Sequence, residues 1–173
     1  MCKSKGVRSG PVFKEPQAMV VSSGARVMSL TDGTAKMSKS DPQEGSRINI
    51  LDPPDEIVRK IKKCKTDAFV GIEAGNPERP EAENLLTIYK AVQPDRDESA
   101  IISEVEGMSW GDFKPLLSSA LVEYLSPIQE RYKEIRQDDD YLKGVLETGK
   151  DRAQERANET LKRAKIAMGF NVV

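Results

Sequence analysis

Residues 112–125 read DFKPLLSSALVEYL, and their apolar side chains recur every three or four positions. This spacing places them on one face of an α-helix, where they form a stripe that is buried against a core. The pattern predicts one long helix that begins near Ser109 or Asp112 and whose apolar positions are Phe113, Leu116, Leu117, Ala120, Leu121, Tyr124, Leu125, Ile128, Tyr132 and Ile135. The chain is therefore expected to be mainly α-helical.

Shorter helices are predicted before this stripe. Asp52 offers a helix cap and Pro53 a proline at the first helical position, so a helix is expected from there to about Lys65. Helical periodicity also covers residues 81–92 and 98–106.

Two further helices are predicted after the stripe. One opens at residues 138–140 and ends at Gly149, because glycine commonly terminates a helix. The other runs to Met168, and its small side chains allow close packing against the long helix. The second part of the chain is thus expected to be an all-helical bundle.

The first part of the chain shows extended patterns. Residues 18–21 and 26–30 are predicted to be short strands, and residues 46–51 alternate in a way that is typical of extended backbone. Residues 66–80 are rich in glycine and proline, which favours a connecting loop. We therefore divide the chain into residues 1–65, the connecting loop 66–80 and a helical domain, residues 81–173.

Composition excludes several classes of function. The chain has 27 basic and 28 acidic residues, so its overall charge gives no sign of nucleic-acid binding. It has no histidine, which excludes His-based acid–base chemistry and His-containing metal sites in these 173 residues. Cys2 and Cys64 lie too far apart in sequence for a metal-ligand motif. No run approaches 18 apolar residues, so no membrane span and no membrane partner are predicted.

Residues 36–40 read KMSKS and combine two ammonium groups with two hydroxyls in a loop. Such a loop suits a polyphosphate, because lysines supply mobile charges and hydroxyls and loop amides add hydrogen bonds. The glycine-rich GK[ST] loop of other phosphate sites is absent. A loop rich in Lys and Ser is more often a solvated surface loop, so its flanking residues must decide.

These flanking residues carry a family resemblance. The pentapeptide is the second signature of class I aminoacyl-tRNA synthetases, and its surroundings resemble the bacterial or organellar tryptophanyl-tRNA synthetases in particular. The matching segments are GARVMSLTDGTA at 24–35, DP at 41–42, NLLTIY at 84–89 and PIQERY at 127–132. The resemblance covers nearly the whole chain and is to the carboxyl-terminal portion of that family.

The resemblance implies a fold and an activity. Residues 1–65 would be the end of a Rossmann-like α/β nucleotide fold that carries the KMSKS loop, and residues 81–173 would resemble an anticodon-binding helical domain. The implied function is a tryptophan–tRNA ligase, which activates tryptophan with ATP and transfers it to tRNA(Trp). The parent family is homodimeric, but much of its dimer interface lies upstream of this chain.

The resemblance also implies roles for single residues. Lys39 and Lys36 would stabilise the pyrophosphate leaving group as tryptophan attacks the α-phosphate of ATP. Met37 and the backbone near Val27 would lie beside the adenine, and Ser38 and Ser40 would hold phosphates and the shape of the loop. ATP would be a substrate accompanied by Mg²⁺, with no protein-bound metal.

Two alternatives stay open at this level: a non-catalytic tRNA-binding fragment, and another class I enzyme such as a tyrosyl-tRNA synthetase. The basic residues between Arg59 and Lys65 are typical of a solvated helix face as well as of a tRNA-binding patch. The resemblance implies a cytoplasmic location for a bacterial protein, and a mitochondrial or chloroplast one for a eukaryotic protein.

We expect the purified 173-residue chain to be unable to activate tryptophan by itself. In the family, a histidine-containing loop holds the ATP phosphates from the opposite side, and this chain has no histidine. The chain is accordingly expected to begin within the last strands of the catalytic fold. The measurement is tryptophan-dependent exchange of pyrophosphate into ATP, and exchange above background would contradict the expectation.

Overall fold

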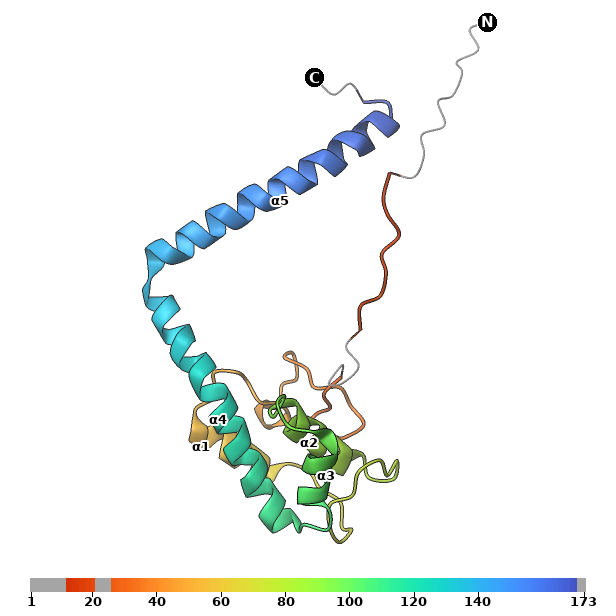
Figure 1. Cartoon of the computed structure of the whole chain (residues 1–173), viewed down its shortest axis with the longest axis vertical. Coiled ribbons are helices and arrows are strands. Elements are labelled where there is room, and N and C mark those ends of the chain that lie inside the picture. The colour runs from red at the N-terminus through yellow and green to blue at the C-terminus, as the bar shows by residue number, and fades with distance from the viewer. Residues whose placement is uncertain (1–11, 21–25, 171–173) are drawn as a thin grey trace, which may run out of the picture. The chain divides into compact units, whose positions relative to one another are not determined.

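The computed structural model describes residues 12–20 and 26–170, and its long regular elements are helices. In chain order they are the 3₁₀ helix η1 (Glu44–Ser46) and the α-helices α1 (Pro54–Lys63), α2 (Pro80–Ala91), α3 (Glu98–Val105), α4 (Trp110–Gln137) and α5 (Asp139–Ala167) (Figure 1). No strand occurs within the described ranges. The prediction of a mainly α-helical chain is confirmed.

The chain divides into two compact units. One contains the described residues between 20 and 133, which are the loops of the first part, α1 to α3 and most of α4. The other contains residues 12–19 together with residues 134–170. The candidate site lies in the first unit, which we call the core unit.

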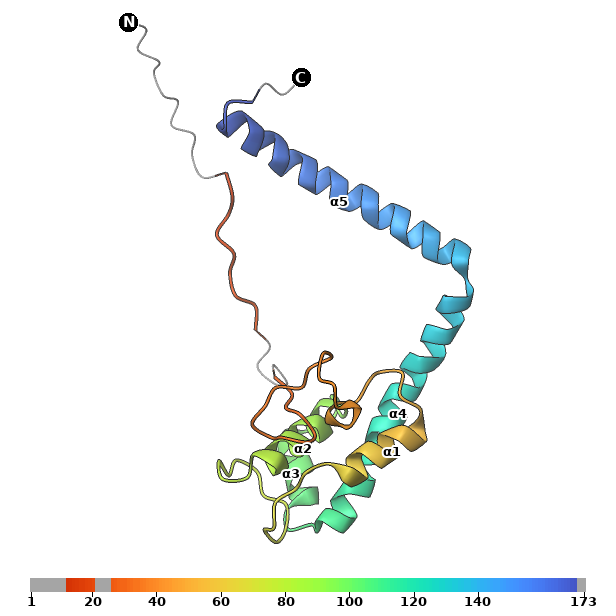
Figure 2. The same cartoon turned by 180° about the vertical axis from the view of Figure 1, so that it is seen from behind.

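The core unit is held together by one apolar core. Figures 1 and 2 show α1, α2 and α3 gathered beside the first half of α4. Lys114 on α4 joins it directly to the end of α1, because its Nζ donates to the carbonyl oxygens of Cys64 (3.0 Å) and Lys62 (3.2 Å). The core residues come from before, within and after residues 66–80 and include Leu30, Ile57, Ile61, Ile72, Leu85, Leu86, Tyr89, Ile101, Phe113, Leu117 and Leu121.

The α-helices of the core unit begin at prolines or at a residue that caps the helix. Pro80 starts α2, where its missing N–H is not needed. Asp97 caps α3 with a carboxylate that accepts from the backbone N–H groups of Ser99 and Ala100. The first two helices of the unit therefore start at prolines and the third at an acidic cap.

A buried arginine fixes the start of α2. Arg79 is 2% exposed and donates from Nε and Nη2 to both carboxylate oxygens of Asp67, at 2.9 and 3.0 Å. Its guanidinium also lies 5.3 Å from the ring centre of Phe69 and 6.0 Å from that of Trp110. Burial alone raises the pKa of Asp67, but hydrogen bonds from Arg79 and the Phe69 amide outweigh it and hold that pKa below its ordinary value.

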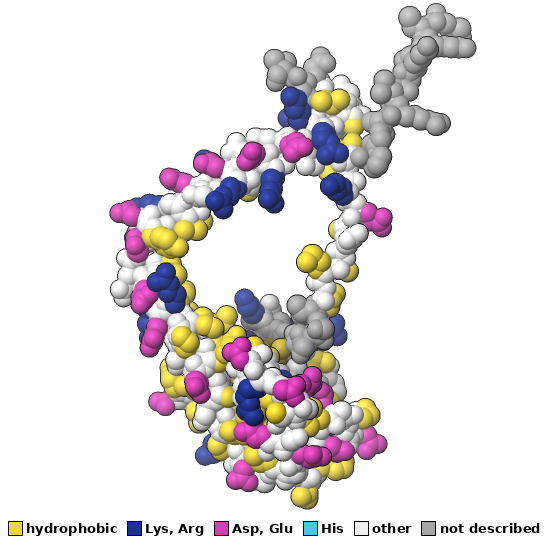
Figure 3. Space-filling view, viewed as in Figure 1, with side chains coloured by type: hydrophobic (Ala, Val, Ile, Leu, Met, Phe, Trp, Pro, Cys, Tyr) yellow, Lys and Arg dark blue, Asp and Glu magenta, His cyan; other side chains and the backbone are white. Residues whose placement is uncertain are grey.

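The second unit is built around α5. Its first turn is capped by Asp138, whose carboxylate accepts from the Tyr141 amide at 2.8 Å. Figure 3 shows acidic and basic side chains interspersed along α5, and none of its residues is buried. The predicted packing of its small side chains against the long helix stays a prediction.

The two helices predicted after the long helix form a single helix, α5. The sequence predicts a helix end at Gly149, but α5 runs through that residue without interruption. A glycine inside a helix costs only about 1 kcal/mol relative to alanine, and no proline follows it to stop the helix. The residues around it, such as Leu146, Glu147 and Lys150, are strong helix formers, so the helix continues.

The predicted strands are also corrected. Residues 18–20 form no strand, and Val21 lies outside the described residues. Residues 26–30 contribute only an isolated antiparallel bridge between Met28 and Lys36, and residues 46–51 have no ladder partner. A strand needs a neighbour, and here side chains from helices take the place that a neighbouring strand would occupy.

Asp52 does not cap α1 as the sequence predicts. Pro53 is the N-cap, Pro54 is the first helical residue, and no side chain caps the helix. The Asp52 carboxylate instead accepts from the Asn49 amide at 2.9 Å and from Lys60 Nζ at 2.5 Å. The Asp52 carboxylate pairs with the buried Lys60 and does not cap the helix, because an unpaired buried ammonium is more costly than an uncapped helix end.

We predict that Arg79→Ala lowers the free energy of unfolding by about 3 kcal/mol, because it leaves the carboxylate of Asp67 half-buried without its partner. The matched control is Arg96→Ala. Arg96 pairs with Glu104 at 2.8 Å but is 41% exposed, so its loss should cost less than about 1 kcal/mol. Urea unfolding of both variants measures the difference, and equal losses would contradict the prediction.

Candidate functional site

The KMSKS residues form one arm of a short hairpin, residues 26–41, which we call the hairpin. The amide of Met37 donates to the carbonyl of Val27 at 3.0 Å, and the amide of Ser29 donates to the carbonyl of Ala35 at 2.8 Å. These two hydrogen bonds flank the Met28–Lys36 bridge, so Lys36 stands directly opposite Met28.

The tip of the hairpin is closed by an aspartate. Asp32 Oδ1 accepts from the Thr34 amide at 3.0 Å and from the Thr34 hydroxyl at 2.7 Å. These hydrogen bonds hold the pKa of Asp32 below its ordinary value. The carboxylate is thus engaged in the turn.

The base of the hairpin is attached to α2. Asn84 is 6% exposed, and its Oδ1 accepts from the Met28 amide at 2.8 Å while its Nδ2 donates to the Met28 carbonyl at 2.9 Å. Gly33 approaches the start of the same helix so closely that an added Cβ would lie 2.8 Å from the backbone nitrogen of Glu81. The helix therefore contacts both the arm and the tip of the hairpin.

A second segment, residues 47–51, faces the hairpin. Arg47 Nη1 donates to the Asp41 carbonyl at 2.8 Å, and Asn49 is held by Asp52. Burial alone raises the pKa of Asp52, but hydrogen bonds from Lys60 and Asn49 hold it below its ordinary value. From α4, Gln129 Nε2 donates to the carbonyls of Ile50 at 2.7 Å and Asp52 at 3.0 Å.

The hairpin and residues 47–51 enclose a pocket of about 590 Å³. Among the described residues that line it, four are basic and none is acidic. The apolar and amide part of the lining is formed by Val27, Met37, Ile48, Asn49, Ile50 and Leu51, and the basic part by Arg26, Lys36, Lys39 and Arg47. A pocket with this lining can hold an anion beside a flat apolar group.

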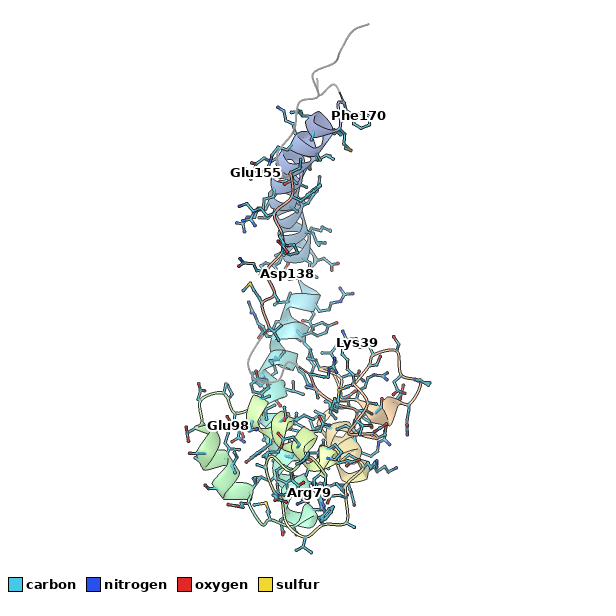
Figure 4. All side chains as sticks on the ribbon, turned by 90° about the vertical axis from the view of Figure 1, so that its right-hand side faces the viewer. Lys39, Arg79, Glu98, Asp138, Glu155 and Phe170 are labelled. Atoms are coloured by element: carbon cyan, nitrogen blue, oxygen red, sulfur yellow. The ribbon has the colours of Figure 1, made fainter. Side chains whose placement is uncertain are left out.

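Four of the six residues predicted to bind ATP lie together in this pocket: Val27, Lys36, Met37 and Lys39. Ser38 and Ser40 do not line it; the Ser40 amide donates to Ser38 Oγ at 3.2 Å, which shapes the turn that follows. Figure 4 shows Lys39 at the opposite end of the core unit from the buried Arg79. The roles of all six residues in binding and catalysis stay predictions.

Arg26 and Arg47 were not predicted as site residues. Arg26 is the first residue of the predicted strand 26–30, and Arg47 lies in the extended segment that follows the KMSKS loop. The available signal was an arginine at the edge of each segment that flanks the lysine motif. Their convergence depends on long-range contacts that a local pattern does not contain.

The described residues hold no cluster of three or more His, Cys, Asp or Glu side chains that would suit a metal ion. Within the same ranges, no helix is long and apolar enough to cross a membrane. Cys64 is buried, and burial raises the pKa of its thiol. A buried thiol of this kind is a packing residue.

Residues 2–126 match the family model described as tRNA synthetases class I (W and Y). Over 162 residues the chain is 52% identical to the tryptophan–tRNA ligase of Thermosynechococcus vestitus. The chain belongs to the tryptophanyl-tRNA synthetase family of class I enzymes. This match covers 94% of the chain but 49% of the relative.

A second relative has the same similarity. The chloroplastic/mitochondrial tryptophan–tRNA ligase of Arabidopsis thaliana is 52% identical over 168 residues, which are 97% of the chain and 41% of that protein. The chain thus spans about half the length of the curated tryptophan–tRNA ligases it matches.

Solved structures of the tryptophanyl-tRNA synthetase family show the same fold. The tryptophanyl-tRNA synthetase of Mycoplasma pneumoniae superposes with a TM-score of 0.78 and 30% identity, over 87% of this chain and 45% of that one. The Campylobacter jejuni enzyme, complexed with ADP and tryptophan, gives a TM-score of 0.62 and 25% identity, over 92% and 48%.

We predict that Gly33→Ala lowers the free energy of unfolding by about 1–3 kcal/mol, because the new methyl group would collide with the backbone of Pro80 and Glu81. Gly45→Ala is the matched control, since an added Cβ there meets no atom within 4 Å. Its effect should stay within about 0.5 kcal/mol. Urea unfolding compares the two, and a Gly33 variant as stable as the control would contradict this prediction.

Proposed function

We propose that this chain is the part of a tryptophan–tRNA ligase that holds ATP through its KMSKS loop. In this proposal residues 1–65 are the end of a Rossmann-like nucleotide fold, and residues 81–173 form the anticodon-binding-like helical domain. The observation that carries the proposal is the pocket that Lys36 and Lys39 line together with two arginines, with no acidic residue among the described residues of its lining.

The charge of the pocket supports binding of a triphosphate. A polyphosphate needs several positive charges at once, and the four basic side chains come from two separate segments, the hairpin and residues 47–51. Three carboxylates near these segments are engaged elsewhere: Asp32 accepts from the Thr34 hydroxyl, Asp41 from the Gln43 amide and Asp52 from Lys60. The positive charge of the pocket therefore remains for a ligand.

The apolar part of the pocket supports binding of the base. Val27 and Met37 lie on paired arms of the hairpin, where the Met37 amide bonds the Val27 carbonyl. Both side chains are partly buried and pack against the core, so they offer a fixed apolar surface to a flat ring.

The chemistry follows from these positions. When the tryptophan carboxylate attacks the α-phosphate, the bond to the bridging oxygen breaks and the pyrophosphate gains negative charge. Lys36 and Lys39 would stabilise that charge more strongly in the transition state than in bound ATP. Tryptophan, tRNA(Trp), Mg²⁺ and a second subunit belong to this proposal through the family. The proposed location also comes from the family: the cytoplasm if the protein is bacterial, and a mitochondrion or chloroplast if it is eukaryotic, as for the chloroplastic/mitochondrial relative.

We predict that ATP with Mg²⁺ shifts the backbone amide resonances of Val27 and of residues 36–40 in a ¹⁵N NMR titration of the chain. Lys39→Ala should weaken this binding about tenfold, because a charge-assisted hydrogen bond to phosphate is lost. Adenosine, which has no phosphate, should bind more weakly than ATP.

The matched control is Lys62→Ala, which removes an exposed lysine from α1 outside the pocket. At 0.15 M salt its charge is largely screened from the pocket, so ATP affinity should change less than about twofold. Equal weakening by both variants, or ATP-induced shifts outside the pocket, would overturn the proposal.

A further inference from the structure

The two walls of the pocket have little secondary structure of their own. The hairpin has a single isolated bridge, and residues 47–51 belong to no helix or ladder. Loops of this kind are mobile unless other groups satisfy their backbone. In the core unit, each wall has its backbone bonded by one side-chain carboxamide. Asn84 of α2 bonds the hairpin, and Gln129 of α4 bonds the segment of residues 47–51 and Asp52.

On the hairpin side, the bridge geometry leaves Met28 with a free edge. Because the hydrogen bonds of the hairpin flank the Met28–Lys36 pair, the N–H and C=O of Met28 point away from Lys36. Asn84 accepts from that N–H at 2.8 Å and donates to that C=O at 2.9 Å. The carboxamide replaces a neighbouring strand and fixes the residue that stands opposite Lys36.

On the other side, Gln129 uses both hydrogens of one nitrogen. Its Nε2 donates to the carbonyls of Ile50 and Asp52, which stand two residues apart in the turn before α1. Ile50 lines the pocket, and Asp52 holds Asn49, which lines it too. Gln129 therefore fixes the wall that faces the lysines.

We propose that Asn84 and Gln129 are positioning residues for ATP, which act through the backbone of the two pocket walls. Neither side chain lines the pocket, so neither needs to touch the nucleotide. The inference rests on the proposed function for its ligand, but the placement of the walls can be measured without any ligand.

The test uses the full 173-residue chain with Asn84→Ala and Gln129→Ala. We expect each variant to bind ATP with Mg²⁺ about tenfold more weakly in the NMR titration, because two hydrogen bonds to the wall are lost. Hydrogen exchange without ligand should become faster at Met28, Ser29 and Met37 in the first variant and at residues 50–52 in the second. Amides of the α2 and α4 interiors should keep their protection.

The matched control is Gln93→Ala. Gln93 also donates from Nε2 to a backbone carbonyl, that of Tyr89 at 3.4 Å, but it lies outside the pocket. It should change neither ATP affinity nor exchange in the walls. Asn84→Asp keeps an acceptor for the Met28 amide but sets a buried carboxylate oxygen against the Met28 carbonyl, so it should weaken ATP binding at least as much as Asn84→Ala.

The outcomes separate the two claims. Unchanged ATP affinity in both alanine variants, or equal weakening by the Gln93 control, overturns the positioning inference. Absence of ATP binding by the wild-type chain overturns the proposed function, and the exchange data then decide the inference alone: faster exchange confined to the walls supports it, and unchanged exchange overturns it. Should Asn84→Ala fail to fold, Gln129→Ala carries the same test.

Discussion

The backbone of Met28 must be hydrogen-bonded on two sides, and the candidate site depends on how that requirement is met. One side pairs with the arm that carries Lys36, and the other meets the carboxamide of Asn84. An unsatisfied edge at this depth would cost about as much as a lost hydrogen bond for each group. The helix thus supplies by one side chain what a sheet supplies by a whole strand.

The charge of the pocket also depends on hydrogen bonds and ion pairs made outside it. Basic side chains gather at the pocket while the acidic groups close to it are committed to turns and internal pairs, as Asp32 and Asp52 are. An uncommitted carboxylate would neutralise a lysine and compete with phosphate for it. Lys60 compensates the negative charge of Asp52, and the Thr34 hydrogen bonds hold the ionised Asp32 carboxylate in the turn, so neither carboxylate lines the pocket.

Local patterns predicted the helices well because period and end signals are written in neighbouring residues. Helical periodicity predicted α2 and α3, and the apolar stripe predicted the extent of α4. Local patterns gave wrong predictions where a residue distant in sequence determines the local structure. Asp52 was predicted to cap a helix, but the buried Lys60 binds its carboxylate. Residues 26–30 were predicted to be a strand, but the side chain of Asn84 bonds Met28 where a neighbouring strand would.

The residues of the candidate site were also predicted only in part. Lys36 and Lys39 were identified because they are adjacent in sequence and form a motif. Arg26 and Arg47, which share the pocket with them, come from outside that motif and were missed. Their arrival at one place is a result of tertiary structure.

The first turn of α2 links the stability of the core unit to the geometry of the site. Arg79, fixed by its paired carboxylate Asp67, sets where the helix starts, and Gly33 packs against the backbone of that same turn. Asn84 follows within the next turn and a half, so its position is inherited from the buried ion pair. Arg79 and Lys36 are thus connected through α2, Asn84 and Met28, although the arginine and Lys39 of the pocket lie at opposite ends of the core unit.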